Sequence, residues 1–174
     1  MRIFSNAGPL MALGKLGQVE LLFRLFGQVR LPAAVHREVV LQGLQQGRPD
    51  AYLVQRAIQR GLLVVEKEIA GLPADIASLP LDAGEKETIY LALSEPGSLV
   101  LLDDLKAREE AKARGLTVKG TLGVIAQAYQ AELVSLEEVE VLFKAITADD
   151  SIWISDALCR RVLDRLKAGG RQDG

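Results

Sequence analysis

The sequence has very few residues of the kinds that build disulfides and nitrogen- or sulfur-ligated metal sites. Its 174 residues include one cysteine, Cys159, and one histidine, His36. A single cysteine excludes an internal disulfide and a cysteine-rich zinc site, and a single histidine excludes histidine-rich metal chemistry. A Ser–His–Asp triad would depend on His36 alone, and the position of His36 in a predicted helix favours an ordinary, partly exposed residue.

Long apolar runs are also absent from the sequence. No stretch approaches the ~18 residues that a membrane-spanning helix requires, so we expect no contact with a membrane interior. The N-terminus contains Arg2, but Ser5, Asn6 and Pro9 follow before an apolar segment could form. We therefore predict that the chain carries no secretory signal and is cytoplasmic.

An excess of positive charge is the third absence. The 21 Lys and Arg residues are balanced by 23 Asp and Glu residues, which gives a net charge of −2. This balance excludes a protein that coats nucleic acid with a broad basic surface. Any contact with DNA or RNA has to be local or arranged through metal ions.

The composition predicts one folded domain. Hydrophobic residues make up 49% of the chain, which is enough to bury a core and excludes intrinsic disorder. A length of 174 residues fits a domain of ordinary size. We expect a single domain over residues 1–168, followed by a frayed tail at 169–174.

Hydrophobic spacing predicts strands alternating with helices. The expected strands are 2–5, 28–31, 62–66, 99–102 and 116–118. The expected helices are two short ones within 10–25, then 33–46, 51–60, 82–95, 105–114, 122–131, 136–146 and 155–167, with an irregular connection over 71–81. Strands separated by helices form right-handed crossovers, so the prediction is an α/β fold: a three-layer α/β/α sandwich with a short parallel sheet of about five strands and extra C-terminal helices.

Two sequence patterns resemble sites that bind or accept phosphate, but neither has all the residues that such a site requires. Gly8 to Lys15 looks like a nucleotide-binding loop, yet five residues separate its glycines and Leu16 stands where Ser or Thr is needed. The pair Asp103 and Asp104 with Lys119 resembles a phospho-acceptor site. Such a site needs its acid pair after the first strand, where this chain has only Asn6.

Oxygen-bearing side chains are the remaining candidates for a site. In parallel sheets the site lies beyond the carboxyl ends of the strands. The candidates are Asn6, Glu38, Glu85 and Asp103, with Glu87 and Asp104 as neighbours. Carboxylates without His or Cys select hard cations such as Mg²⁺ or Mn²⁺. Such ions activate water and neutralise phosphate charge, which suits phosphodiester hydrolysis without a histidine base.

Each candidate also has a simpler structural interpretation. Asn6, Asp103 or Asp104 could cap a helix. Asp82 and Glu85 have capping-box spacing, which would engage Glu85 with the backbone of Asp82. Glu38 could be an ordinary surface charge, although the valines and leucines around it leave that helix no broad polar face.

Five segments in order resemble the PIN-domain nucleases. They are SNAGPLMALGKLGQVELL, VRLPAAVHREVV, AGEKETIYLAL, LVLLDDLKAREEAKARGL and VKGTLGVIAQA. The chain is most similar to a small bacterial and archaeal branch often described as predicted nucleic-acid-binding proteins. The resemblance covers residues 2–166 and implies an α/β sandwich that cuts single-stranded or structured RNA with Mg²⁺ or Mn²⁺.

The resemblance also implies roles for individual residues. The four acid positions of the family fall on Asn6, Glu38, Glu85 and Asp103, and Glu85 is preferred over Glu87 because it lies 18 residues before Asp103. Asp104 would then be a helix cap beside the site. The backbone at Gly120 and Thr121 could meet a phosphate at a helix N-terminus or form an ordinary cap.

The main departure from the family is Asn6, where the wider family has Asp. Three functions remain open. The first is a metal-dependent endoribonuclease, as in the toxins of toxin–antitoxin pairs, with an antitoxin protein as partner. The second is a weak or silent nucleic-acid-binding module, which Asn6 favours. The third is a partner-binding protein whose apolar C-terminal helices form an interface; those helices, such as 152–166, could instead close the core or form a homodimer.

Overall fold

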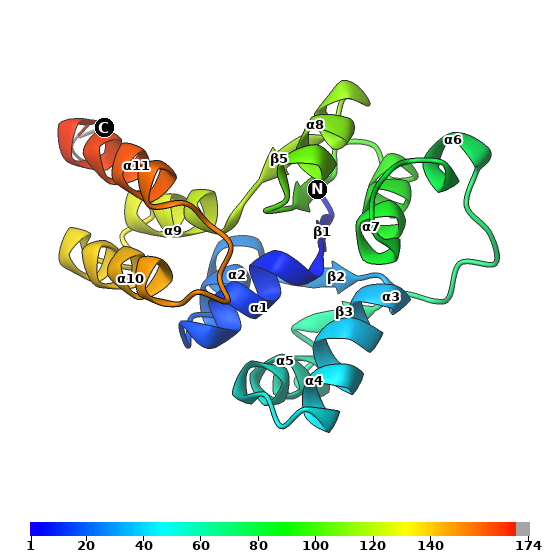
Figure 1. Ribbon diagram of the computed structural model, residues 1–174, viewed down its shortest axis with the longest axis horizontal. Coiled ribbons are helices and arrows are strands. Elements are labelled where there is room, and N and C mark those ends of the chain that lie inside the picture. Colours follow the sequence, from blue (N-terminus) through cyan, green and yellow to red (C-terminus); the bar gives the residue numbers. More distant parts are fainter. Residues whose placement is uncertain (170–174) are drawn as a thin grey trace. The chain divides into compact units, whose positions relative to one another are not determined.

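The computed structural model describes residues 1–169, and its first 121 residues form a parallel sheet with helices on both sides (Figure 1). The sheet has five strands in the order β3-β2-β1-β4-β5. The strands are β1 (Ile3–Ser5), β2 (Val29–Leu31), β3 (Leu63–Val65), β4 (Leu99–Leu101) and β5 (Thr117–Lys119). The predicted α/β/α sandwich with a short parallel sheet is confirmed.

Helices fill the connections between these strands. They are α1 (Ala7–Lys15), α2 (Glu20–Phe26), α3 (Ala33–His36), η1 (Arg37–Gln42), α4 (Gly43–Gln45), α5 (Pro49–Gln59), α6 (Ala74–Ala77), α7 (Ala83–Leu93) and α8 (Leu105–Ala113). The irregular connection expected over 71–81 was partly wrong, because it contains α6. The helix expected over 33–46 is interrupted by η1, a π-helical segment.

The strand register brings the carboxyl ends of β1 and β4 together. These strands pair in parallel, with Ile3 opposite Leu99 and Ser5 opposite Leu101. All three residues of each strand are buried. Residues that follow β1 and β4 therefore emerge side by side at one edge of the sheet.

The core lies on both faces of this short sheet. One cluster packs α6, α7 and α8 against β1 and β4, and its largest members are Phe4, Ile76, Ile89 and Leu102, each 2% exposed or less. Burial on both faces explains why the central strand β4 is a continuous apolar run without alternation. The strands are thus held mainly by the helices that cover them.

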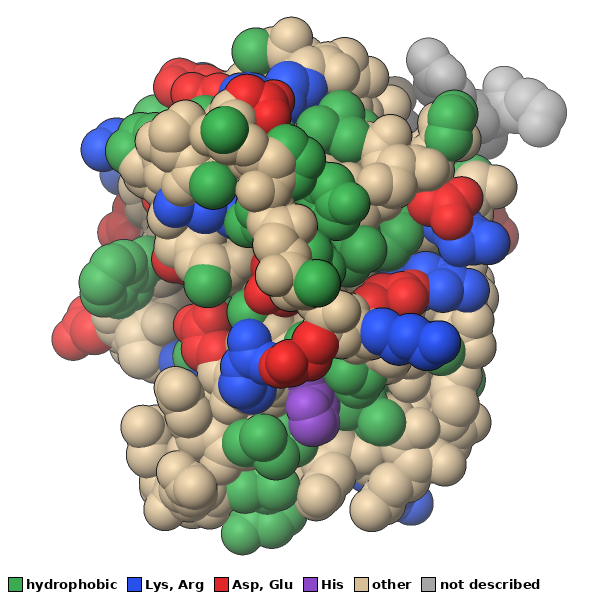
Figure 2. Space-filling model, turned by 90° about the vertical axis from the view of Figure 1, so that its right-hand side faces the viewer, with side chains coloured by type: hydrophobic (Ala, Val, Ile, Leu, Met, Phe, Trp, Pro, Cys, Tyr) green, Lys and Arg blue, Asp and Glu red, His purple; other side chains and the backbone are tan. Residues whose placement is uncertain are grey.

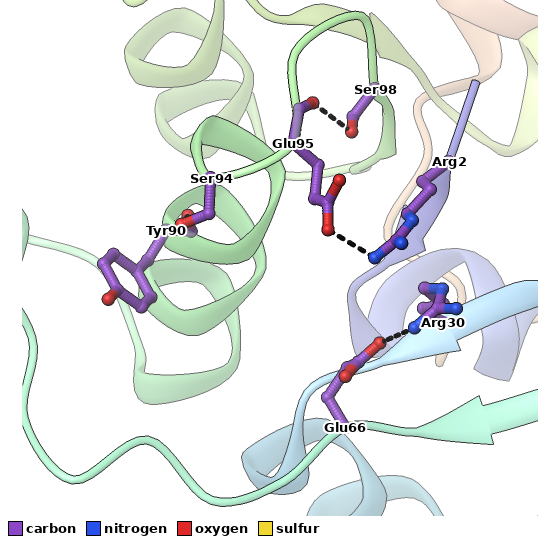
Figure 3. A network of polar contacts seen from close by, with 7 residues as sticks. All are labelled: Arg2, Arg30, Glu66, Tyr90, Ser94, Glu95 and Ser98. Carbon is purple, nitrogen blue, oxygen red and sulfur yellow. Dashed lines mark hydrogen bonds and ion pairs between the residues drawn. The ribbon is translucent and has the colours of Figure 1, made fainter.

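Ion pairs join segments that are distant in sequence (Figure 3). Arg2, before β1, pairs with Glu95, which follows α7. Arg30 in β2 pairs with Glu66, the residue after β3. The chain's contacts therefore tie β1 to the α7–β4 connection and β2 to the end of β3.

A second compact unit begins at Leu122. It contains most of α9 (Thr121–Gln130), together with α10 (Leu136–Ala148) and α11 (Asp156–Gly169). The last two helices pack against each other and bury Phe143 and Cys159. A tail at 169–174 was expected, and all of it but Gly169 lies outside the described residues. The single-domain organisation stays a prediction.

The helices of the described part are short compared with a bilayer. The longest of them, α11, has 14 residues. At ~1.5 Å per residue it is shorter than a hydrocarbon core of ~30 Å. No helix within residues 1–169 is long and apolar enough to cross a membrane.

Candidate functional site

Asn6 and Asp103 follow neighbouring strands at the carboxyl edge of the sheet. The backbone N–H of Asn6 donates to the carbonyl of Leu101 at 3.0 Å, which extends the β1–β4 pairing by one residue. Asp103 lies two residues after Leu101. The structure therefore brings the backbones of both candidates to the same edge.

The side chain of Asn6 is buried without a hydrogen-bond partner. Asn6 occupies the N-cap position of α1, yet its side chain makes no capping hydrogen bond. The residue is 5% exposed, and its Oδ1 atom is one of the few buried side-chain atoms left unpaired within the described chain. An unpaired buried oxygen costs about 1–3 kcal/mol. The capping interpretation is thus wrong, and Oδ1 is available to a ligand.

The N-terminus of α7 lies directly beside Asn6. A Cβ atom on Gly84 would stand 2.9 Å from Oδ1 of Asn6 and 3.5 Å from Oδ1 of Asp82. Asp82 Oδ1 accepts from the Glu85 N–H at 2.7 Å, and Glu85 Oε2 accepts from the Asp82 N–H at 3.0 Å. The capping box predicted from the spacing is confirmed, and it fixes Glu85 near Asn6 through the glycine between them.

Glu38 and Glu85 belong to one cluster of four carboxylates. Burial raises the pKa of Glu38, the Asp82 carboxylate raises it further, and the Arg48 guanidinium opposes both. Burial raises the pKa of Glu85 to about 7; the Asp82 backbone hydrogen bond opposes that shift, while Asp82, Asp104 and Glu38 add to it. We call Glu38, Asp82, Glu85 and Asp104 the acidic cluster. Neighbouring carboxylates in this cluster raise the pKa of Glu38 and of Glu85, and a bound cation would offset that repulsion.

Asp103 is engaged by the start of α9 instead. Its Oδ1 accepts from the Thr121 backbone N–H at 2.7 Å, and its Oδ2 accepts from the Thr121 hydroxyl at 2.6 Å. Burial raises the pKa of Asp103, while the bonds from Thr121 and the nearby Arg108 guanidinium lower it. Asp103 therefore holds Thr121. The Thr121 amide that could meet a phosphate already donates to a carboxylate.

The two neighbouring acids also have structural partners. Asp104 Oδ1 accepts from the Ala107 N–H at 2.9 Å, which confirms the predicted cap of α8. Glu87 Oε2 accepts from the Ala34 N–H at 3.0 Å. Oxygens of Asp82, Glu85, Asp104 and Glu87 thus accept from backbone N–H groups. For Glu38, the charges that shift its pKa are those of Asp82 and Arg48.

Sequence reasoning missed two contributors to this region. Asp82 was seen only as a helix cap, although its charge acts on both Glu38 and Glu85. Arg48 was not singled out; its Nη2 atom donates to the carbonyl of Val39 in η1 at 3.3 Å and lies 3.6 Å from Asp50 Oδ2. The capping box was the available signal for Asp82. Nothing in the spacing indicated Arg48.

The face of the sheet unit that carries α3, α6 and α7 is mixed in charge. Figure 2 shows acidic and basic side chains interspersed among hydrophobic ones on this side of the molecule. Arg37 illustrates the pattern, because it pairs with Glu68 and lies 3.9 Å from Glu87. Basic groups on this face are therefore partly neutralised by neighbouring acids.

The donor set fits a hard cation, although the carboxylates are not tightly gathered. Within residues 1–169 no three His, Cys, Asp or Glu side chains lie close enough together to hold a metal ion. The unpaired Asn6 Oδ1, however, stands beside an all-oxygen cluster in which burial and neighbouring carboxylates raise the pKa of Glu38 and of Glu85. Oxygen donors of this kind suit Mg²⁺ or Mn²⁺.

The raised pKa of Glu85, caused first by burial and then by neighbouring carboxylates, leads to a prediction about pH. The pKa of Glu85 is about 7 in the folded chain and 4.5 in its ordinary state, so the folded chain holds the proton more tightly. Its contribution to stability is therefore complete below pH 4.5 and is lost as the pH rises through 7. Glu85→Gln stays neutral and keeps an oxygen that can accept from the Asp82 N–H.

Without metal, Glu85→Gln should exceed wild type in stability by about 1–3 kcal/mol at pH 8 and match it near pH 4. Urea unfolding in EDTA measures this difference at each pH. Equal unfolding midpoints at pH 8 would mean that the Glu85 carboxylate is not strained by its surroundings.

One comparison with known proteins gives a match, and that match is to a family model. The family model DUF3368, described as a PIN domain, matches residues 2–168. No curated protein and no solved structure gives a match. The match spans nearly the whole chain, including all of the residues discussed above.

Proposed function

Because the chain belongs to the PIN-domain family, we propose that it is a metal-dependent endoribonuclease. Membership gives it a nuclease-type or nucleic-acid-binding function, and PIN domains generally use divalent metal ions. The observation that carries the finer proposal is the buried, unpaired Oδ1 of Asn6 beside the acidic cluster at the carboxyl edge of the sheet. A bound cation would give this unpaired amide oxygen a partner, because the oxygen could ligate it.

Asn6, Glu38 and Glu85 are the residues that would hold the cation, with Asp103 at the same edge of the sheet, two residues after β4. A divalent cation bound here supplies a water of lowered pKa and positive charge to offset that of the phosphate. Glu85, with a pKa of about 7, holds its proton in part at neutral pH until a cation displaces it. The carboxylates also repel the phosphate backbone when no cation is present.

The substrate we propose is single-stranded or structured RNA. With a net charge of −2, the chain has no general attraction for polyanions. Contact with RNA then depends on local basic groups and on the cation that neutralises the acidic cluster. This requirement ties RNA binding to metal occupancy.

Cleavage of a mixed RNA pool tests the proposal. Purified protein should cut the pool with Mn²⁺ and lose all cleavage when EDTA is added, because the acidic cluster alone repels the substrate. Gel electrophoresis of end-labelled RNA measures this. Cleavage that ignores the chelator would exclude the metal mechanism.

A silent nucleic-acid-binding module is the second candidate. Two observations favour it: the first ligand position is the neutral Asn6, and Asp103 is engaged by Thr121. A protein of this kind would retain RNA on a filter yet cut none of it. The pool experiment separates the two candidates, because only the nuclease produces fragments.

Substitutions at Asn6 should tune the site. Asn6→Asp adds a negative charge beside the acidic cluster, so it should raise Mn²⁺-dependent cleavage and lower the Mn²⁺ concentration needed. Asn6→Ala removes the donor oxygen, so it should reduce cleavage and raise the Mn²⁺ concentration needed. Cleavage rates measured against Mn²⁺ concentration decide this, and an active wild type that equals Asn6→Ala would remove Asn6 from the site.

We also propose that the protein is a homodimer and the toxin of a toxin–antitoxin pair. The support for assembly is the apolar surface around the start of α11, where Trp153 is 93% and Leu158 is 41% exposed. Light scattering at micromolar concentration should give twice the chain mass of 18.9 kDa. A single species at the chain mass would contradict the dimer.

A further inference from the structure

Glu87 connects the two helices that carry Glu85 and Glu38. It lies on α7 two residues after Glu85, and its side chain is 13% exposed. Its Oε2 atom reaches the neighbouring helix α3 and accepts from the Ala34 N–H at 3.0 Å. This bond joins residues that are 53 positions apart in the sequence.

The bond replaces a missing helix cap. Ala34 is the second residue of α3, and the first N–H groups of a helix have no acceptor within it. The N-cap residue is Pro32, which provides no side-chain hydrogen bond. Glu87 supplies the acceptor from another helix, and its negative charge suits the positive N-terminal end of α3.

The other carboxylate oxygen of Glu87 faces the guanidinium of Arg37. Arg37 Nη2 lies 3.9 Å from Glu87 Oε1, and the same guanidinium pairs with the exposed Glu68. Both oxygens of Glu87 therefore point to α3 and to the start of η1. The sequence offered Glu87 as an alternative metal ligand to Glu85. In the structure its two oxygens contact the Ala34 N–H and the Arg37 guanidinium instead.

We infer that Glu87 is a positioning residue: by capping α3 it sets where η1 presents Glu38 relative to Glu85, and so sets the affinity of the site for a divalent cation. Glu38 lies four residues after Ala34, in η1, which directly follows α3. Glu85 lies one half-turn before Glu87 on α7. The inference rests on the proposed metal site, and it adds a residue that tunes the site without touching the ion.

Mn²⁺ titration by calorimetry on four variants tests this inference. Glu87→Gln keeps an oxygen that can accept from Ala34 and should bind Mn²⁺ nearly as wild type does. Glu87→Met keeps the volume but has no such acceptor, and it should bind about tenfold more weakly. Glu87→Asp keeps the charge but is one methylene shorter, so it should also bind weakly and serves if the Met variant unfolds. Glu68→Gln is the control, because it removes a charge next to Arg37 but leaves the Ala34 bond.

Hydrogen exchange at the Ala34 amide is the second readout, and it needs no metal. The amide should exchange slowly in wild type and Glu87→Gln and about tenfold or more faster in Glu87→Met. Unchanged exchange in Glu87→Met, or equal Mn²⁺ affinity in all variants, would overturn the inference. Equal weakening by Gln and Met would overturn it too, because charge alone would then be responsible. If wild type binds no Mn²⁺, the proposed function fails, while exchange at Ala34 still decides whether Glu87 caps α3.

Discussion

Replacing Glu38 by Gln should lower Mn²⁺-dependent RNA cleavage about 100-fold or more. The substitution keeps the size of the side chain and removes one negative charge of the acidic cluster, so the cation loses a ligand that brings charge. Stability should not fall, because burial and Asp82 already disfavour the charged form of Glu38. Cleavage rate against Mn²⁺ concentration, together with the melting temperature, measures both effects.

The matched control is Glu20→Gln. Glu20 begins α2 and pairs with Arg60 on the surface, so its replacement removes the same charge from an exposed ion pair. Exposed pairs of this kind contribute ~0–1 kcal/mol, and the variant should cut RNA at the wild-type rate. An active wild type that is indifferent to Glu38→Gln would show that the cleavage site lies elsewhere.

Replacing Gly43 by Ala should destabilise the sheet unit by about 1–3 kcal/mol. A Cβ atom at Gly43 would stand 2.6 Å from Ala51 Cβ and 2.9 Å from Arg48 Nη2. Ala51 is fully buried in α5, and its Cβ can move only with the backbone. The gain of ~1 kcal/mol in helix propensity from Gly to Ala is too small to reverse the sign.

Chemical denaturation measures this loss, and Gly71→Ala is its control. No atom lies within 4 Å of the position of a Cβ at Gly71, so that change should alter stability by less than ~0.5 kcal/mol. Equal stability of the two variants would mean that α4 and α5 separate easily.

The fold could be predicted because short, mostly apolar segments bounded by turn residues alternate with helical spacing. Leu99–Leu101, for example, is buried on both faces of a parallel sheet. The local deviations could not be predicted. Pro73 was interpreted as part of an irregular connection, yet it is the N-cap of the four-residue helix α6. The π-helical segment η1 shares its hydrophobic spacing with an α-helix, so the pattern gives no signal for it.

The site was predictable in its residue types but less so in its side-chain contacts. Local pairs such as Asp82 with Glu85, and the cap by Asp104, follow from spacing along one helix turn, and both are confirmed. The contact of Asp103 with Thr121 depends on how β4 and β5 end side by side, which spacing does not encode. The unpaired state of Asn6 is likewise a property of packing.

The shortness of the strands has a consequence for how this protein can change over generations. Each strand has three residues, so Asn6 stands only two positions from the core residue Phe4, and Asp103 directly follows the buried Leu102. Substitutions that change the volume of Phe4 or Leu102 should displace the backbone at Asn6 and Asp103, the proposed site residues. If the proposed site is in use, we therefore expect the core residues of β1 and β4 to change less over generations than core residues far from this edge of the sheet.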